Sequence, residues 1–166
     1  MTMNTMTEAT SERRSPPVFG TATFTTTWRP QLILEVSNLQ RAIAFYKVLF
    51  DDVPSLQLGN EARFEPSRPP VALVLRERAG AQARDGHVGI QLKYTADIQT
   101  YKQRLEGAGY SVKLEEQETA CCFSTANKVW VTDPDENLWE LYVLLGQNTS
   151  EVRCGPSCAC ESGGCG

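Results

Sequence analysis

The stretch PQLILEVSNLQRAIAFYKVLF, residues 30–50, decides the fold because it joins a strand directly to a helix. Residues 30–36 are rich in Leu, Ile and Val and predict a strand. Ser37 or Asn38 can cap the following helix by accepting a hydrogen bond from a free backbone N–H. The helix carries one apolar stripe at four-, three- and four-residue spacing, made of Leu39, Ile43, Tyr46 and Phe50.

The same order of elements is expected twice. After the helix, short strands are predicted near 55–59, 62–66 and 70–77. The second half opens with a strand at 87–92, continues with a helix that Thr95 can cap, and ends with strands near 110–116, 127–132 and 138–145. Each half has one helix for four strands and cannot cover both faces of its sheet alone. The sequence therefore predicts an α+β fold of two βαβββ modules, which pair into curved mixed sheets around one metal cavity.

The folded body is expected to span residues 29–146. Residues 1–28 are rich in Thr, Ser and Pro and predict a disordered leader. Residues 147–166 are rich in Gly, Ser and Cys and predict a flexible tail.

Charge and cysteine content exclude several classes of protein. The chain of 166 residues has 16 basic and 20 acidic side chains, a net charge of -4 that disfavours nucleic-acid binding. Its longest apolar runs, such as residues 71–75, are too short to cross a membrane. Of its six cysteines, two are adjacent and four lie in the last 13 residues, which is not a disulfide framework. A cytoplasmic protein with reduced thiols is expected.

Three residues at matching places in the two halves are candidate metal ligands. Gln31 begins the first strand, His87 begins the equivalent strand of the second half and is the only histidine, and Glu140 lies in the apolar last strand. An amide, an imidazole and a carboxylate would form a variant of the two-histidine, one-carboxylate set that holds non-haem Fe(II). The alternatives are that Gln31 pairs at a strand edge, that His87 is a half-buried structural histidine and that Glu140 faces solvent.

Cys121 and Cys122 are a second candidate site. Neighbouring Cα atoms lie ~3.8 Å apart, whereas most disulfides need ~4.4–6.8 Å. Two adjacent thiols can instead bind one thiophilic atom, and a monosubstituted trivalent arsenic, R–As(OH)2, has two exchangeable positions. Residues 115–120 before the pair are polar and loop-like, which argues against the alternative of two buried, inert cysteines.

The last four cysteines follow the pattern C-x3-C-x-C-x4-C, at positions 154, 158, 160 and 165. This spacing fits no zinc finger. Two interpretations remain open: that these thiols capture soft metals and pass them on, and that they are incidental in a solvated tail.

The modules and the candidate ligands resemble the vicinal oxygen chelate superfamily, which includes glyoxalase I, extradiol dioxygenases and fosfomycin and bleomycin resistance proteins. Within it, the stretches ETACCF (118–123) and NKVWVTDPD (127–135), followed by Trp139-Glu140, resemble the carbon–arsenic lyases that demethylate trivalent organoarsenicals. The resemblance covers residues 30–146.

The resemblance implies Fe(II) ligands at Gln31, His87 and Glu140 and an arsenical site at Cys121 and Cys122. The implied activity is an Fe(II)-dependent dioxygenase that detoxifies methylarsonous acid and trivalent aromatic arsenicals to arsenite, with dioxygen as the second substrate. A binding protein for arsenical, cadmium or another soft metal is the alternative. No nucleic-acid or membrane partner is expected, and both a monomer and a homodimer stay open.

This sequence departs from the family pattern in one turn, and it differs from glyoxalase I in one metal ligand. The turn after Thr132 commonly reads Asp-Pro-Asp-Gly-Asn, and here Glu136 replaces the Gly, at a position suited to positive φ. Glyoxalase I uses a fourth, carboxylate ligand from the last strand of its first half, where this chain has none before Glu77. A glutathione-dependent lyase or transferase is therefore disfavoured.

Overall fold

The computed structural model describes residues 28–121 and 124–147; the expected leader and tail lie almost wholly outside these ranges. The first module comprises β1 (Gln31–Val36), α1 (Leu39–Phe50), β2 (Leu56–Leu58), β3 (Glu61–Phe64) and β4 (Ala72–Glu77). The second comprises β5 (His87–Gln91), α2 (Thr95–Gly107), β6 (Val112–Cys121), β7 (Ser124–Thr132) and β8 (Leu138–Gln147). The predicted order of elements is confirmed in both halves.

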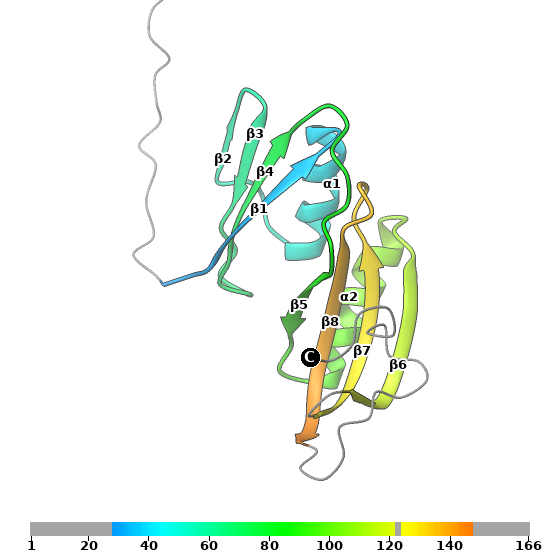
Figure 1. The fold of residues 1–166 in the computed structure, drawn as a ribbon. Coiled ribbons are helices and arrows are strands. Elements are labelled where there is room, and N and C mark those ends of the chain that lie inside the picture. The colour runs from blue at the N-terminus through cyan, green and yellow to red at the C-terminus, as the bar shows by residue number, and fades with distance from the viewer. Residues whose placement is uncertain (1–27, 122–123, 148–166) are drawn as a thin grey trace, which may run out of the picture.

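Each module forms one mixed four-stranded sheet (Figure 1). The strand order is β1-β4-β3-β2 in the first sheet and β5-β8-β7-β6 in the second. In both sheets the opening strand pairs in parallel with the last one, and the other pairs are antiparallel. β1 and β5 therefore occupy equivalent edge positions, and the α+β fold class is confirmed.

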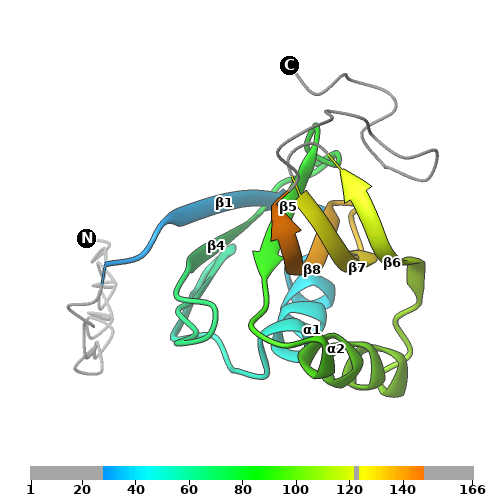
Figure 2. The ribbon, with the colours of Figure 1, turned by 90° about the horizontal axis from the view of Figure 1, so that it is seen from below.

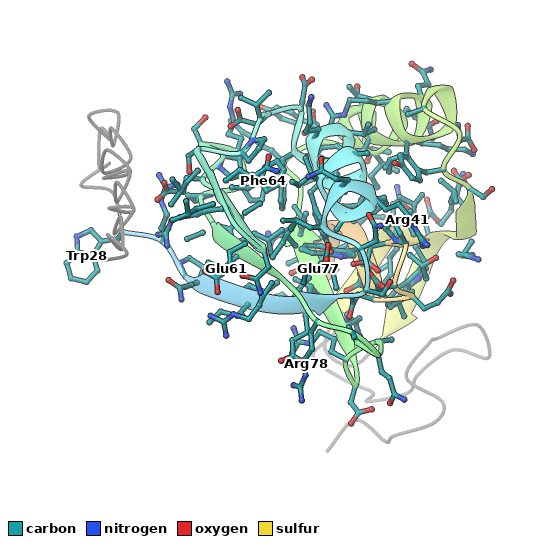
Figure 3. The ribbon with its side chains drawn as sticks, turned by 90° about the horizontal axis from the view of Figure 1, so that it is seen from above. Trp28, Arg41, Glu61, Phe64, Glu77 and Arg78 are labelled. Carbon is teal, nitrogen blue, oxygen red and sulfur yellow. The ribbon has the colours of Figure 1, made fainter. Side chains whose placement is uncertain are left out.

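The two helices lie side by side and join the modules through one apolar core (Figure 2). Tyr46 and Phe50 of α1 pack on Trp139 of β8, with ring centroids 5.7 and 6.1 Å apart. Arg41, labelled in Figure 3, donates from Nη2 to the carbonyl oxygen of Pro134 at 2.7 Å. Neither described helix is long and apolar enough to cross a membrane.

Side chains cap both helices, although only the first cap matches the prediction. Asn38 accepts a hydrogen bond from the backbone N–H of Arg41 at 2.9 Å, as expected of an N-cap. The prediction that Thr95 caps the second helix is wrong, because Tyr94 is the capping residue and Thr95 is already helical. The carboxylate of Asp97 accepts from the backbone N–H of Tyr94 at 2.9 Å and so stabilises this end.

The loop expected before the cysteine pair is a strand. β6 runs to Cys121 and pairs with β7, with a register shift between Glu116 and Thr119. β6 is an edge strand, and the described side chains of Glu115, Gln117 and Glu118 are exposed. The polar character of these three residues therefore indicated exposure and not the lack of regular structure.

The turn between β7 and β8 places a non-glycine residue in the left-handed region. Glu136 has φ 65°, at the position where the sequence predicted a positive φ. A Cβ is strained there, because it approaches the following carbonyl oxygen.

Replacing Glu136 with glycine should raise the free energy of unfolding by about 0.5–1 kcal/mol, since relief of the strain exceeds the added flexibility of the unfolded chain. Urea denaturation would measure the change. The matched control, Gln103→Gly in the exposed middle of α2, should lower stability by about 1 kcal/mol. A loss of stability in Glu136→Gly would contradict the strain argument.

Candidate metal and thiol site

His87 and Glu140 are brought together by the parallel pairing of β5 with β8. Gly89 lies opposite Glu140 in this register, and alternation along β5 puts His87 on the same face as Gly89. The Nε2 atom of His87 lies 3.4 Å from Oε2 of Glu140. The two side chains share the sheet face that points away from the helices.

Glu140 is buried and its other oxygen is occupied. Its exposed fraction is 8%, so the alternative in which Glu140 faces solvent is wrong. Nζ of Lys128 lies 2.9 Å from Oε1, and Lys128 is itself buried. A buried carboxylate needs such a partner, because an unpaired charge is expensive to remove from water.

Sequence analysis did not identify Lys128 as a site residue. It lies on β7 two positions before Trp130, which pairs in register with Glu140. The strand alternates Lys128 and Trp130 with Val129 and Val131, a pattern that places the lysine on the polar face of the sheet. This alternation, together with a carboxylate on the next strand, could have identified Lys128 as a site residue.

The indole ring of Trp130 lies beside the side chains of the two candidate ligands. The His87 ring meets the Trp130 ring edge to face, with centroids 5.1 Å apart at 78°. The ammonium of Lys128 lies 5.9 Å from the centre of the same indole. The imidazole, the carboxylate and the ammonium therefore all lie close to one aromatic ring.

Gly89 allows the side chains of Glu140 and Tyr142 to approach the backbone of β5 closely. A Cβ at position 89 would lie 3.4 Å from Oε2 of Glu140 and 3.1 Å from a ring carbon of Tyr142. The second distance is too short for an unstrained contact. A side chain at position 89 would therefore crowd the carboxylate oxygen that faces His87.

Gln31 lies at the start of β1, on the exposed side of its strand. It lines a gap of about 460 Å³ between the edges of β1 and β5, and Gly89 lines the same gap. In the part of the chain that the structure describes, Gln31 makes no hydrogen bond to His87 or Glu140. The structure thus brings Gln31 to the neighbourhood of Gly89 without a direct contact to the other two candidates.

Glu77 does not belong to this site. Its Oε2 accepts a hydrogen bond from the backbone N–H of Leu39 at 2.7 Å, at the start of α1 (Figure 3). In the β1–β4 register Glu77 pairs with Val36, at the opposite end of β1 from Gln31. The two ends of β1 are five residue positions apart, which corresponds to about 16 Å. A fourth carboxylate ligand of the glyoxalase I kind is therefore not available from this residue.

The donor set fits a transition metal such as Fe(II). An imidazole nitrogen and a carboxylate oxygen already face each other, and position 89 carries no side chain that would crowd that oxygen. Within residues 28–121 and 124–147 no three His, Cys, Asp or Glu side chains form a group that could hold a metal. The amide of Gln31, which lines the same gap as Gly89, is a further candidate donor.

Of the cysteine pair, the structure describes only the backbone of Cys121, at the end of β6. Cys121 is the last residue of β6 and pairs with Ser124 across the hairpin. The side chain of Cys121 and all of Cys122 lie outside the described residues.

The fold agrees with the comparison to known families. Residues 29–141 match the model of the Glyoxalase/Bleomycin resistance protein/Dioxygenase superfamily, and the chain belongs to this superfamily. A solved glyoxalase/bleomycin resistance protein/dioxygenase from Alicyclobacillus acidocaldarius has the same fold, with a TM-score of 0.59, 13% identity and coverage of 70% of this chain and 90% of the other.

Curated relatives narrow the resemblance within the superfamily. A trivalent organoarsenical cleaving enzyme from Thermomonospora curvata is 37% identical over 142 residues, which cover 83% of this chain and 93% of the relative. The cadmium-induced protein CadI of Mycobacterium bovis is 38% identical over 120 residues, covering 72% of this chain and 78% of the relative. The resemblance to the organoarsenical-cleaving group, first seen in the cysteine pair and the strand after it, is confirmed.

Proposed function

We propose that the protein is an Fe(II)-dependent dioxygenase that cleaves the carbon–arsenic bond of trivalent organoarsenicals and releases arsenite. The observation that carries the proposal is the approach of His87 to Glu140, with Gly89 beside that carboxylate and Lys128 on its second oxygen. The similarity to an organoarsenical cleaving enzyme supports the choice of substrate.

Cys121 and Cys122 bind the arsenic atom of the substrate. Each thiol replaces one hydroxyl of R–As(OH)2, so two As–S bonds form and two water molecules leave. This exchange releases no net proton from protonated thiols, so the affinity should change little below the ordinary thiol pKa of about 8.5, whereas the binding rate should rise with the thiolate fraction. The thiols must stay reduced for this reaction, which favours a cytoplasmic location.

Nε2 of His87, Oε2 of Glu140 and the amide oxygen of Gln31 would hold the metal. Fe(II), when bound, supplies the electrons that activate dioxygen. Lys128 keeps Oε1 of Glu140 in a fixed position, which leaves Oε2 oriented toward His87. The Trp130 ring packs edge to face against the imidazole and helps to orient it.

The overall reaction balances for the smallest substrate: CH3As(OH)2 and O2 give CH2O and As(OH)3. The methyl carbon is oxidised, dioxygen is reduced, and the As–C bond is replaced by an As–O bond. The protein contributes mainly by holding arsenic through sulfur while its carbon substituent faces the metal ligands, and such positioning can lower a barrier by about 7–11 kcal/mol.

The proposal is tested by aerobic turnover. Protein loaded with Fe(II) should convert methylarsonous acid to arsenite and formaldehyde in equal amounts, measured by separating the arsenic species. Protein without iron should bind the substrate and leave it unchanged. If iron-loaded protein in air produces no arsenite, the proposed activity is wrong.

A binding protein is the second candidate function, and the similarity to a cadmium-induced protein favours it. The fold and the thiols would then sequester a soft metal or an arsenical without turnover. Stoichiometric binding with no arsenite formed under iron and air would select this function.

Substituting Gly89 with alanine should weaken metal binding by about tenfold, because its Cβ crowds Tyr142 and Oε2 of Glu140. Titration with Co(II), followed by its visible absorption, would measure the change. Gly107→Ala is the matched control, since a Cβ there meets nothing within 4 Å. Equal affinities in both variants would show that metal binding does not require a glycine at position 89.

A further inference from the structure

The inner edges of the two sheets come close at one end only. β1 and β5 are each paired on one side, and within the described residues no strand pair joins the two sheets. Just after β1, the backbone N–H of Ser37 donates to Oδ1 of Asp135 at 2.9 Å, in the turn between β7 and β8. Toward its start, β1 diverges from the second sheet (Figures 1 and 2). The modules therefore form a wedge that is closed beside this turn.

Several contacts hold the closed end of the wedge. The Tyr46 hydroxyl donates to Oδ2 of Asp133 at 2.6 Å. The backbone N–H of Arg84, in the linker between the modules, donates to Oδ1 of Asn137 at 2.9 Å. Both acceptors, like Asp135, belong to the turn of residues 133–137. This turn is thus the fixed point of the contact between the modules.

Gln31 lies at the open end, across a gap from the other two candidate ligands. The gap of about 460 Å³ is lined by Gln31 on β1 and by Gly89 and Gln91 on β5. Gly89 lies beside Oε2 of Glu140, because a Cβ at position 89 would be 3.4 Å from this oxygen. The gap therefore separates Gln31 from the carboxylate with which it would share a metal.

A shared metal sets a short distance between its donor atoms. Metal–nitrogen and metal–oxygen bonds of about 2.0–2.2 Å place neighbouring donor atoms about 3–3.5 Å apart. Nε2 of His87 and Oε2 of Glu140 lie 3.4 Å apart and already satisfy this distance. Gln31 can satisfy it only if β1 moves toward β5.

Apolar side chains along the gap favour such a movement. Leu32, Val71 and Val88 line the gap and are only partly buried, although they pack against the core. Closing the gap would remove more of their surface from water, which is a favourable change. Their burial would therefore add to the free energy that a third metal ligand supplies.

We propose that metal binding closes the gap between the modules, because the amide oxygen of Gln31 joins His87 and Glu140 on the metal. β1 then moves toward β5, and the turn of residues 133–137 is the hinge. This inference rests on the ligand set of the proposed function and makes no use of turnover. Gln31 is then both a metal ligand and the link between the modules.

Nuclear magnetic resonance of the full chain, with reduced thiols and bound Co(II), tests the inference. The shifts that Co(II) induces, relative to the Zn(II)-bound protein, depend on the position of each backbone amide around the metal. The shifts of β5 and β8 should locate Co(II) beside His87 and Glu140, and the shifts of β1 and β4 then give the position of the first module. We expect β1 to lie closer to β5 than in the structure, with Gln31 at bonding distance from the metal.

Three variants isolate the amide of Gln31. Gln31→Ala should bind Co(II) at least about tenfold more weakly and should keep the gap open. Gln31→His supplies an imidazole donor and should restore closure. Gln91→Ala is the matched control, because it removes an exposed amide from the same gap and should close as the wild type does. The Gln31 side chain is also exposed, so these substitutions should leave the fold intact.

Several results would overturn closure by Gln31. Wild-type shifts that fit the separation of β1 from β5 in the structure would do so, as would shifts that place Co(II) away from His87 and Glu140. Closure in Gln31→Ala, or its loss in Gln91→Ala, would show that the amide of Gln31 is not the link. A doubling of the mass on Co(II) binding, with Gln31 supplied by a second copy of the chain, would exclude closure within one chain.

A turnover assay separates this inference from the proposed function. If the modules close and the iron-loaded protein forms no arsenite, closure stands and the proposed function fails. If arsenite forms while the modules stay apart, the proposed function stands and closure fails.

Discussion

Replacing His87 with alanine should lower arsenite formation from methylarsonous acid by about 10³-fold or more, a barrier increase of about 4 kcal/mol. His87 is the only imidazole in the chain, and its Nε2 faces Oε2 of Glu140. Its loss removes one of the two donors that already converge, and no other histidine can replace it. The initial rate with Fe(II) in air, with the arsenic species separated, would measure the effect.

Unfolding does not account for this expected loss. The His87 side chain is 38% exposed, so its truncation should change the free energy of unfolding by less than about 1 kcal/mol. The loss of the Co(II) absorption spectrum would show that the defect lies in metal binding.

Comparison with a cysteine variant separates the loss of the metal from the loss of the arsenical. His87→Ala should still bind methylarsonous acid through Cys121 and Cys122. Cys121→Ser/Cys122→Ser should keep the metal and lose the arsenical. Normal turnover in His87→Ala would exclude the imidazole as a ligand, and loss of both functions in both variants would indicate a folding defect.

Some local features of the fold could be predicted from single residues. Asn38 caps α1 because its short side chain reaches the backbone N–H of Arg41. Glu136 adopts the positive φ that the turn requires, although it is not a glycine. Thr95 was chosen wrongly as a cap because Asp97, three residues after Tyr94, stabilises the helix end from inside. The sequence contains both Thr95 and Asp97, and it does not show which of them stabilises the start of the helix.

The proximity of His87 to Glu140 was harder to predict. It depends on the parallel register that puts Gly89 opposite Glu140, and register depends on long-range packing. Lys128 was missed for the same reason, since its partner lies on another strand. The polar residues of β6 suggested a loop because an exposed edge strand and a loop have similar composition. Residue type thus indicated what the site contains, while tertiary pairing determines which groups meet.

Asp133 connects the two modules and should have the largest effect on stability. It is buried, and its Oδ2 accepts hydrogen bonds from the Tyr46 hydroxyl at 2.6 Å and from Nδ2 of Asn137 at 2.8 Å. Its Oδ1 accepts from the backbone N–H groups of Asp135 and Asn137, both at 2.9 Å. Burial, and next the charge of Asp133, raise the pKa of Tyr46 well above its usual value, so the phenol keeps the proton that it donates.

Asp133→Ala should lower the free energy of unfolding by about 3–4 kcal/mol, because four donors lose a charged acceptor in a buried site. Tyr46→Phe removes one of these bonds and should cost about 1–2 kcal/mol. Urea denaturation of both variants and of the double variant would give the coupling energy between the modules. Since Tyr46 belongs to α1 and Asp133 to the turn after β7, a large coupling energy is a direct measure of how this contact holds the modules together.

Asp85→Ala is the matched control, because Asp85 is exposed and its substitution should change stability by less than about 0.5 kcal/mol. If Asp133→Ala behaves like this control, the buried network does not stabilise the fold. If the loss in Asp133→Ala is large but Tyr46→Phe has no effect, Asp133 supports only its own turn and the contact between modules depends on the apolar core. The two results together therefore distinguish a polar link between the modules from a local turn bond.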